Sequence, residues 1–377
     1  MYNKLTLSSC QINAKSQRRS SNLELYRIIV MLLIVAHHYV VNSGLTDVMQ
    51  QQPWSVSSVF YYLFGAWGKT GINCFVLITG YFMCQSIITW HKFLKMWIEV
   101  VTYNVVIYII FVWTDYNTLT FSQCIQRLFP IMNINDNFVS CFLLFYLCIP
   151  FLNILVQHIS KRQHQLLILL CLFIYTIHGT VPGFTVVMNY VSWFCVIYII
   201  ASYLRLHSIN VGNDVRFWGI ASALCIMLSV ATIVGQLWLG EFFQRTTNPY
   251  RFVSDSNALM AVLTAVCTFM LFKNIHIPYT RWINLVGAST FGVLLIHANS
   301  NAMRKWLWRD TFDCAGHYAD EWYWFRPFLV VMLVFTVCII VDRVRIVLLE
   351  RPLFKFLNKI YLENRCKIRI RVNRNNL

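Results

Sequence analysis

Residues 22–39 read NLELYRIIVMLLIVAHHY: an acid and a base lie three positions apart, a charge-free apolar run follows, and two adjacent histidines come near its end. The run continues to Gly44. A helix from Arg27 to Gly44 would rise about 27 Å, close to the hydrocarbon thickness of a bilayer. His37 and His38 would then lie inside the membrane, where ionisable side chains are costly and usually functional. This stretch therefore predicts both the fold class and the position of a site.

The composition extends this interpretation to the whole chain. Of its 377 residues, 58% are hydrophobic and 12% are charged, whereas soluble domains carry about a quarter charged residues. We therefore predict an all-α, polytopic integral membrane protein with about ten transmembrane helices. The ten apolar segments are 27–44, 59–84, 93–113, 138–157, 165–178, 189–206, 217–238, 257–273, 283–300 and 326–347.

The net charge of +16 is distributed in a way that indicates topology rather than a nucleic-acid partner. Most Lys and Arg residues fall in the two terminal segments and in alternate short loops, as the positive-inside rule requires. Both termini are then expected to be cytoplasmic, and the loop 301–325 extracytoplasmic. The expected organisation is a cytoplasmic arm (1–20), a ten-helix membrane domain (21–350) and a basic cytoplasmic tail (351–377), which would face solvent or anionic lipid.

Cysteine and metal chemistry contribute little to this picture. Most of the 13 cysteines lie in apolar runs, where they behave as small hydrophobic residues. Cys124 and Cys314 fall in loops on the same predicted side, which leaves a disulfide between them open. No cluster of His, Asp and Glu has the spacing of a metal site, so no metal is expected.

A second ionisable residue is predicted at the depth of the histidines. His38 lies about 16 Å into the first span, and Lys69 lies ten residues into the second, which runs the opposite way. Glycines 65, 68 and 71 leave one face of the second span open to another helix or to a substrate. An amine and an imidazole at one depth indicate a polar cavity, and the alternative for Lys69 is an ion pair that only fixes helix packing.

Two pairs of residues mark the predicted cytoplasmic face. Glu24 and Arg27, at i and i+3, form either a local ion pair that supports the helix or an entrance that binds an anion through Arg27. Lys92 and Lys95 have the same spacing, and they are either phosphate ligands or ordinary topology signals.

The first stretch resembles the first helix of the membrane-bound acyltransferase family 3, in which an acid is followed by an arginine three residues on and a histidine eleven further. Glu24, Arg27 and His38 are in that register, and His37 is not. Segments 71–81, 289–297 and 350–352 are similar to three further motifs of the family, so the resemblance covers roughly 20–365. The chain departs from the family pattern in having Glu24 where Asp is commoner and Lys69 where many members have Arg.

The resemblance implies a stand-alone member without an added esterase-like domain, in the bacterial inner membrane as a multi-pass protein. Such a protein would transfer an acyl group, most often acetyl, from cytoplasmic acyl-CoA to a hydroxyl of an extracellular polysaccharide or lipid-linked sugar; some members transfer succinyl. Its partners would be acyl-CoA, the glycan acceptor and membrane lipids. No permanently bound cofactor is expected, because acyl-CoA is a substrate.

Acyl transfer to a hydroxyl needs a base for the proton and a positive group for the oxyanion. His38 is expected to act as that base or as a transient acyl carrier, and Lys69 to stabilise developing negative charge. Glu24 is expected to order the cytoplasmic entrance, and Arg27, Lys92 and Lys95 to bind the CoA phosphates. The residues expected to line the cavity on the acceptor side are Asn73, His297 and Asn299. For His297 and Asn299, a polar pair that merely faces the outer water is the alternative.

Two other classes of protein remain compatible with the sequence. Buried His and Lys among ten spans also occur in proton-coupled transporters and sugar exporters, although those folds usually show paired, broken helices in two repeats. A non-catalytic subunit of a polysaccharide assembly machine is the third class, and in such a subunit His38 would be dispensable.

Overall fold

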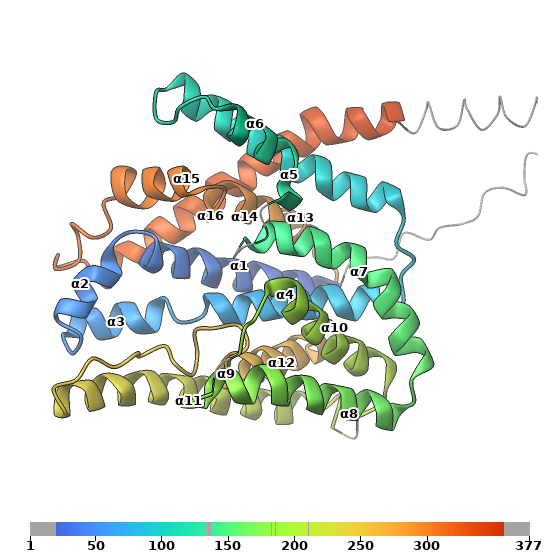
Figure 1. Cartoon of the computed structure of the whole chain (residues 1–377), viewed down its shortest axis with the longest axis horizontal. Coiled ribbons are helices and arrows are strands. Elements are labelled where there is room, and N and C mark those ends of the chain that lie inside the picture. Colours follow the sequence, from blue (N-terminus) through green and yellow to red (C-terminus); the bar gives the residue numbers. More distant parts are fainter. Residues whose placement is uncertain are drawn as a thin grey trace, which may run out of the picture.

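The computed structural model describes residues 20–357, except 133, 135, 136, 182, 185 and 210. The described chain consists of helices and loops and contains no strand, which confirms the all-α prediction. Most of the longer helices run side by side along the long axis of the molecule (Figure 1). Residues 1–19 of the predicted arm and 358–377 of the predicted tail lie outside the described residues.

All ten predicted apolar segments fall on helices. The helices are α1 (Ser21–Val41), α2 (Leu45–Gln51), α3 (Val56–Phe64), α4 (Gly68–Met83), α5 (Trp90–Trp113), α6 (Phe121–Leu128), α7 (Phe138–His158), α8 (Lys161–Leu172), α9 (His178–Thr180), α10 (Tyr190–Leu206), α11 (Val215–Phe242), α12 (Leu259–Asn274), α13 (Arg281–Gly287), α14 (Thr290–His297), α15 (Asn301–Lys305) and α16 (Arg326–Arg345). Four short helical segments complete the list: the 3₁₀ helix η1 (Pro130–Met132) and the π-helical stretches η2 (Phe173–Ile177), η3 (Trp306–Thr311) and η4 (Ile346–Glu350).

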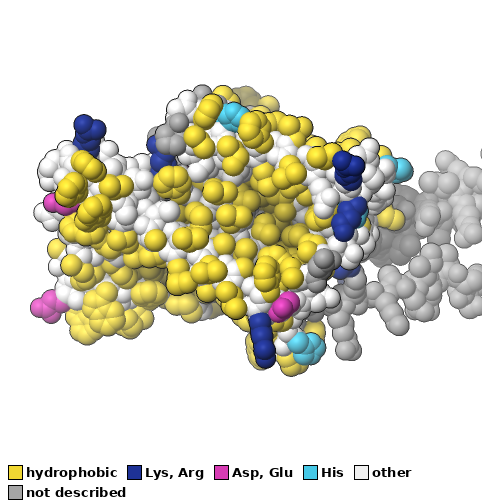
Figure 2. Space-filling view, turned by 90° about the horizontal axis from the view of Figure 1, so that it is seen from below, with side chains coloured by type: hydrophobic (Ala, Val, Ile, Leu, Met, Phe, Trp, Pro, Cys, Tyr) yellow, Lys and Arg dark blue, Asp and Glu magenta, His cyan; other side chains and the backbone are white. Residues whose placement is uncertain are grey.

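Five helices in the described chain are long and apolar enough to cross a membrane: α1, α5, α7, α11 and the helix over Arg326–Leu357. The pair Arg281–His297 and Asn301–Thr311, bent by 94°, would be a sixth span if it counts as one. Hydrophobic side chains cover the middle of the face in Figure 2, and charged side chains lie at its margins. These features are those of a membrane protein, and the count of ten spans stays a prediction.

The second predicted span is divided into two helices. Gly65 ends α3, with its amide donating to the carbonyl of Tyr61, and α4 begins at Gly68. A Cβ on Gly68 would lie 2.3 Å from Cγ of His37, and one on Gly71 would lie 2.8 Å from Cγ1 of Ile34. The predicted open glycine face is confirmed, and its partner is another helix, α1.

Helix α1 lies at the centre of the bundle, in contact with α4, α12, α13, α14 and α16 (Figure 1). Met31, Val35 and Tyr39 on this helix are fully buried. A helix that is apolar on nearly every side is stable in a protein core or in a membrane, and α1 is covered mainly by other helices. This central position lets one short stretch of α1 meet residues from both halves of the chain.

Candidate active site

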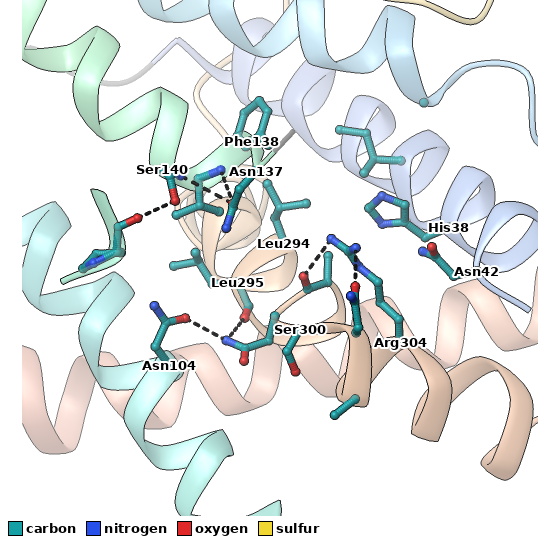
Figure 3. A pocket seen from close by; sticks show the side chains of 18 of the residues that line it. His38, Asn42, Asn104, Asn137, Phe138, Ser140, Leu294, Leu295, Ser300 and Arg304 are labelled. Atoms are coloured by element: carbon teal, nitrogen blue, oxygen red, sulfur yellow. Dashed lines mark hydrogen bonds between the residues drawn. The ribbon is translucent and has the colours of Figure 1, made fainter. Parts of the chain in front are cut away.

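A polar cavity of about 780 Å³ opens beside the C-terminal end of α1 (Figure 3). Its walls come from α1, α4, α5, α6, α7, α10, α14 and α15 and from the loops that adjoin them. The amide side chains that line it are Asn42, Asn104, Asn117, Gln123, Gln126, Asn137, Asn299 and Asn301. An amide both donates and accepts hydrogen bonds, so this wall matches a ligand that is rich in hydroxyl groups.

His38 lines the polar cavity and makes a hydrogen bond to a second histidine. Its Nδ1 lies 2.8 Å from Nε2 of His297, and Nδ1 of His297 lies 2.6 Å from the carbonyl oxygen of Val293. His297 is fully buried and His38 is half-buried. His297, from the ninth predicted segment, thus contacts His38 from behind and does not line the cavity.

These two contacts determine which nitrogen atoms carry hydrogen when both rings are neutral. A carbonyl oxygen only accepts, so Nδ1 of His297 must be the donor to Val293. Nε2 of His297 then accepts, and Nδ1 of His38 is the donor in the bond between the rings. His38 therefore keeps its free lone pair on Nε2, which makes no hydrogen bond within the described residues and is available to take a proton.

His37 has a different environment. Its Nδ1 donates to the carbonyl oxygen of Gly65 at 2.6 Å, and its ring packs against Gly68. The side chain contributes to the cavity wall but is buried. His37 therefore joins α1 to the break between α3 and α4, which is a structural contact.

Lys69 lines the same cavity as His38. Its Nζ donates to the hydroxyl of Tyr190 at 2.6 Å and lies 5.3 Å from the centre of that ring. The partner is a neutral phenol rather than a carboxylate. Tyr190 therefore positions the amine of Lys69 at the cavity without neutralising it, and there it can stabilise an anion.

Two more of the predicted residues have clear positions. Asn73 is fully buried and does not line the cavity: its amide donates to the carbonyl of Ser256 at 2.6 Å and accepts from the indole of Trp193 at 2.9 Å. Asn299 does line the cavity, and its amide donates to Oδ1 of Asn104 at 3.1 Å. Of the three residues predicted on the acceptor side, Asn299 lines the cavity, whereas Asn73 and His297 are buried behind its walls.

The residues predicted at the cytoplasmic face lie away from the polar cavity. Glu24 and Arg27 form an ion pair of 3.1 Å in the first two turns of α1. Lys95 is paired with Glu350 at 2.7 Å, and Lys92 donates to a backbone carbonyl at 2.9 Å. Since Lys95 is neutralised by a carboxylate of this chain, it is a poor candidate for a phosphate ligand.

The cavity residues that the sequence alone did not single out include most of the amides and also Tyr190, Arg127 and Arg304. The two arginines lie on the predicted outer side, where the positive-inside rule makes basic residues uncommon. That departure from the charge pattern could have marked them as functional. Burial lowers the pKa of Arg127, which lies outside the spans in α6. Tyr190 offered no signal, because one tyrosine in an apolar helix resembles any other.

The structure also bears on the cysteines and on metals. Cys124 and Cys314 are separate thiols, so the disulfide left open by the sequence is not formed. Within the described part of the chain, no three His, Cys, Asp or Glu side chains come together as a metal site.

Comparison with known proteins identifies the family. The model of an acyltransferase domain, acyltransferase family 3, matches residues 20–343, which is most of the chain and includes α1, the polar cavity and α14. No curated protein and no solved structure matches the sequence. The extent of the family match, together with the apolar helices, shows that the chain belongs to the membrane-bound acyltransferase family 3 and is an acyltransferase.

Proposed function

We propose that this protein is an O-acyltransferase that moves an acyl group, most commonly acetyl, from cytoplasmic acyl-CoA to a hydroxyl of an extracellular or lipid-linked polysaccharide sugar. It would do so as a multi-pass protein of the bacterial inner membrane. The observation that carries the proposal is the pair of histidines, which leaves an unprotonated Nε2 on His38 at the edge of a cavity lined by amides.

The reaction follows from these groups. The acceptor hydroxyl would give its proton to Nε2 of His38 as its oxygen attacks the thioester carbonyl carbon. The oxyanion that forms would be stabilised by Nζ of Lys69, which Tyr190 holds at the cavity. The carbon–sulfur bond would then break, and His38 would return the proton to the departing CoA sulfur. Hydrogen bonding to His297 would keep the ring in the required tautomer throughout.

The donor would approach from the opposite end of α1. Glu24 holds the guanidinium of Arg27 in the first two turns of that helix, and the amino end of a helix favours anions. Arg27 would contact the CoA phosphates, and the extended pantetheine arm would cover the eleven residues, about 16 Å, between Arg27 and His38. Lys92 and Lys95 are not needed for this arrangement.

Mass spectrometry of surface glycans from cells with and without the gene tests the proposal. The expected result is a mass difference of one acetyl per modified sugar, or one succinyl if that is the group transferred. Restoring the gene should restore the ester, and restoring the His38→Asn form should not. Identical glycans in both strains would contradict the enzyme assignment and favour the transporter or the assembly subunit.

The proposed topology predicts which loops a membrane-impermeant thiol reagent can reach. In a cysteine-free background, Glu321→Cys should react in intact cells, because its loop would be outside. Arg162→Cys should react only after the membrane is opened. Both positions are exposed, so accessibility within the fold is matched. Reaction of Arg162→Cys and protection of Glu321→Cys in intact cells would reverse the orientation, and the acceptor side with it.

A further inference from the structure

The charged side chains among the described residues of the polar cavity are all cations: Lys69, Arg127 and Arg304. Lys69 already has a role at the reacting centre. The two arginines come from α6 and α15, and both are half-buried. In Figure 3 the guanidinium of Arg304 points toward the side of the cavity where His38 and Asn42 lie. A ligand bound at His38 would therefore lie close to Arg304.

Neither arginine is paired with a carboxylate in the described part of the chain. Arg304 donates to Oδ1 of Asn301 and to the carbonyl of Ala298, both at 3.3 Å. Arg127 lies over the ring of Tyr108, with its guanidinium carbon 5.5 Å from the ring centre. The Nε–H of each arginine is buried and has no hydrogen-bond partner among the described residues.

The same chain treats a structural arginine differently. Arg345, at the far end of the bundle, is ion-paired with Glu99 and Asp342 at 2.9 Å and with Glu350 at 3.0 Å. Three carboxylates there offset the cost of removing the guanidinium from water. Within the described residues the partners of the cavity arginines are neutral, so an anion that enters the cavity would offset that cost.

The chemistry of that anion follows from the lining. A guanidinium binds a carboxylate or a phosphate through two parallel N–H donors, and the surrounding amides match hydroxyl groups. The buried side-chain oxygen of Gln123 also lacks a partner among the described residues and would accept from such a hydroxyl. A sugar that carries an acidic group combines both features in one ligand.

We infer that the acceptor is an acidic glycan, whose carboxylate or phosphate groups bind Arg304 and Arg127 while a sugar hydroxyl lies at Nε2 of His38. This inference rests on the proposed acyl transfer and specifies its substrate class. The arginines belong to the acceptor because Arg127 and Arg304 line the same cavity as the C-terminal end of α1, and the donor site is proposed at the opposite end.

The test uses the purified full-length enzyme in lipid and the organism's own surface glycan after ester groups are removed. Three forms of the glycan are compared: native, carboxyl-reduced and dephosphorylated. With acetyl-CoA as donor, neutralising the recognised group should raise the acceptor KM at least tenfold. Whichever treatment has that effect tells whether the group is a carboxylate or a phosphate.

Variants assign the effect to the arginines. Arg304→Gln and Arg127→Gln should each raise the KM for the native glycan about tenfold or more and leave the KM for acetyl-CoA unchanged. Neither should affect the neutralised glycan, and Arg304→Lys should restore part of the loss. Arg309→Gln is the control, because Arg309 is an exposed arginine near Arg304 in the sequence that does not line the cavity.

Two results would overturn the inference while leaving the enzyme assignment intact. One is equal KM values for native and neutralised glycans. The other is an effect of the arginine variants that appears only with succinyl-CoA, which would assign the guanidinium groups to an acidic acyl chain. Absence of transfer by the unaltered enzyme to every form of the glycan would overturn the proposed function itself.

Discussion

Replacing His38 by Asn is expected to lower the rate of acyl transfer by about 10²- to 10⁴-fold, the usual contribution of a positioned general base. In the native protein, Nδ1 of His38 lies 2.8 Å from Nε2 of His297. The side-chain nitrogen of Asn lies near the place of Nδ1, so the variant can still donate to His297. What it loses is the free Nε2. The measurement is acyl transfer to glycan in membranes that contain equal amounts of each protein.

His37→Asn is the matched control. It removes the neighbouring imidazole from the same helix, and its amide can still donate to the carbonyl of Gly65, as Nδ1 of His37 does. This variant should retain most of the activity, with a loss smaller than tenfold. A His38→Asn enzyme that is as active as His37→Asn would show that His38 takes no part in the chemistry.

The same pair of variants separates the two roles open to His38. If Nε2 attacks the thioester itself, labelled acetyl-CoA without an acceptor should leave the label covalently on the protein until glycan is added. His37→Asn would acquire that label and His38→Asn would not. If His38 is only a base, no protein acquires the label, and transfer occurs only when donor and acceptor are both present.

Several features of this site could be predicted because they depend on distances along a single helix. Helix rise predicted that His38 and Lys69 lie at one depth, and both line the polar cavity, whereas the choice of His38 over His37 came from the family resemblance. Glycines 65, 68 and 71 predicted the close approach that α1 makes to α3 and α4. Hydrophobicity alone identified ten segments, and all ten turn out to be helical. Such features follow from the rise and periodicity of a helix, which are the same in every protein.

Other features depend on contacts between distant parts of the chain. His297 was expected at the cavity wall, but the packing of α14 against α1 places it behind His38, 259 positions away in the sequence. Asn73 was expected to meet the acceptor, and it instead fills its hydrogen bonds with Ser256 and Trp193. Helix periodicity gives the face on which a residue lies but not the neighbour that the face meets.

The buried contact between the two histidines leads to the second large effect. Replacing His297 by Leu should lower kcat by about 5- to 13-fold, because one net hydrogen bond of about 1–1.5 kcal/mol no longer favours the productive tautomer of His38. The KM for acceptor should change little, since His297 does not line the polar cavity. This division between kcat and KM distinguishes a positioning residue from one that binds substrate.

His297→Gln distinguishes control of the His38 tautomer from a purely structural role of His297. The side-chain oxygen of Gln lies near the place of Nε2, where it can accept from Nδ1 of His38 as the native nitrogen does. His297→Gln should therefore recover most of the kcat that His297→Leu loses, although Leu is the better residue for a buried apolar position. Thermal unfolding in detergent should rank the variants differently, with Leu at least as stable as Gln. Equal kcat values for the two variants would mean that His297 only fills space behind His38, and the proposed control of the tautomer would be wrong.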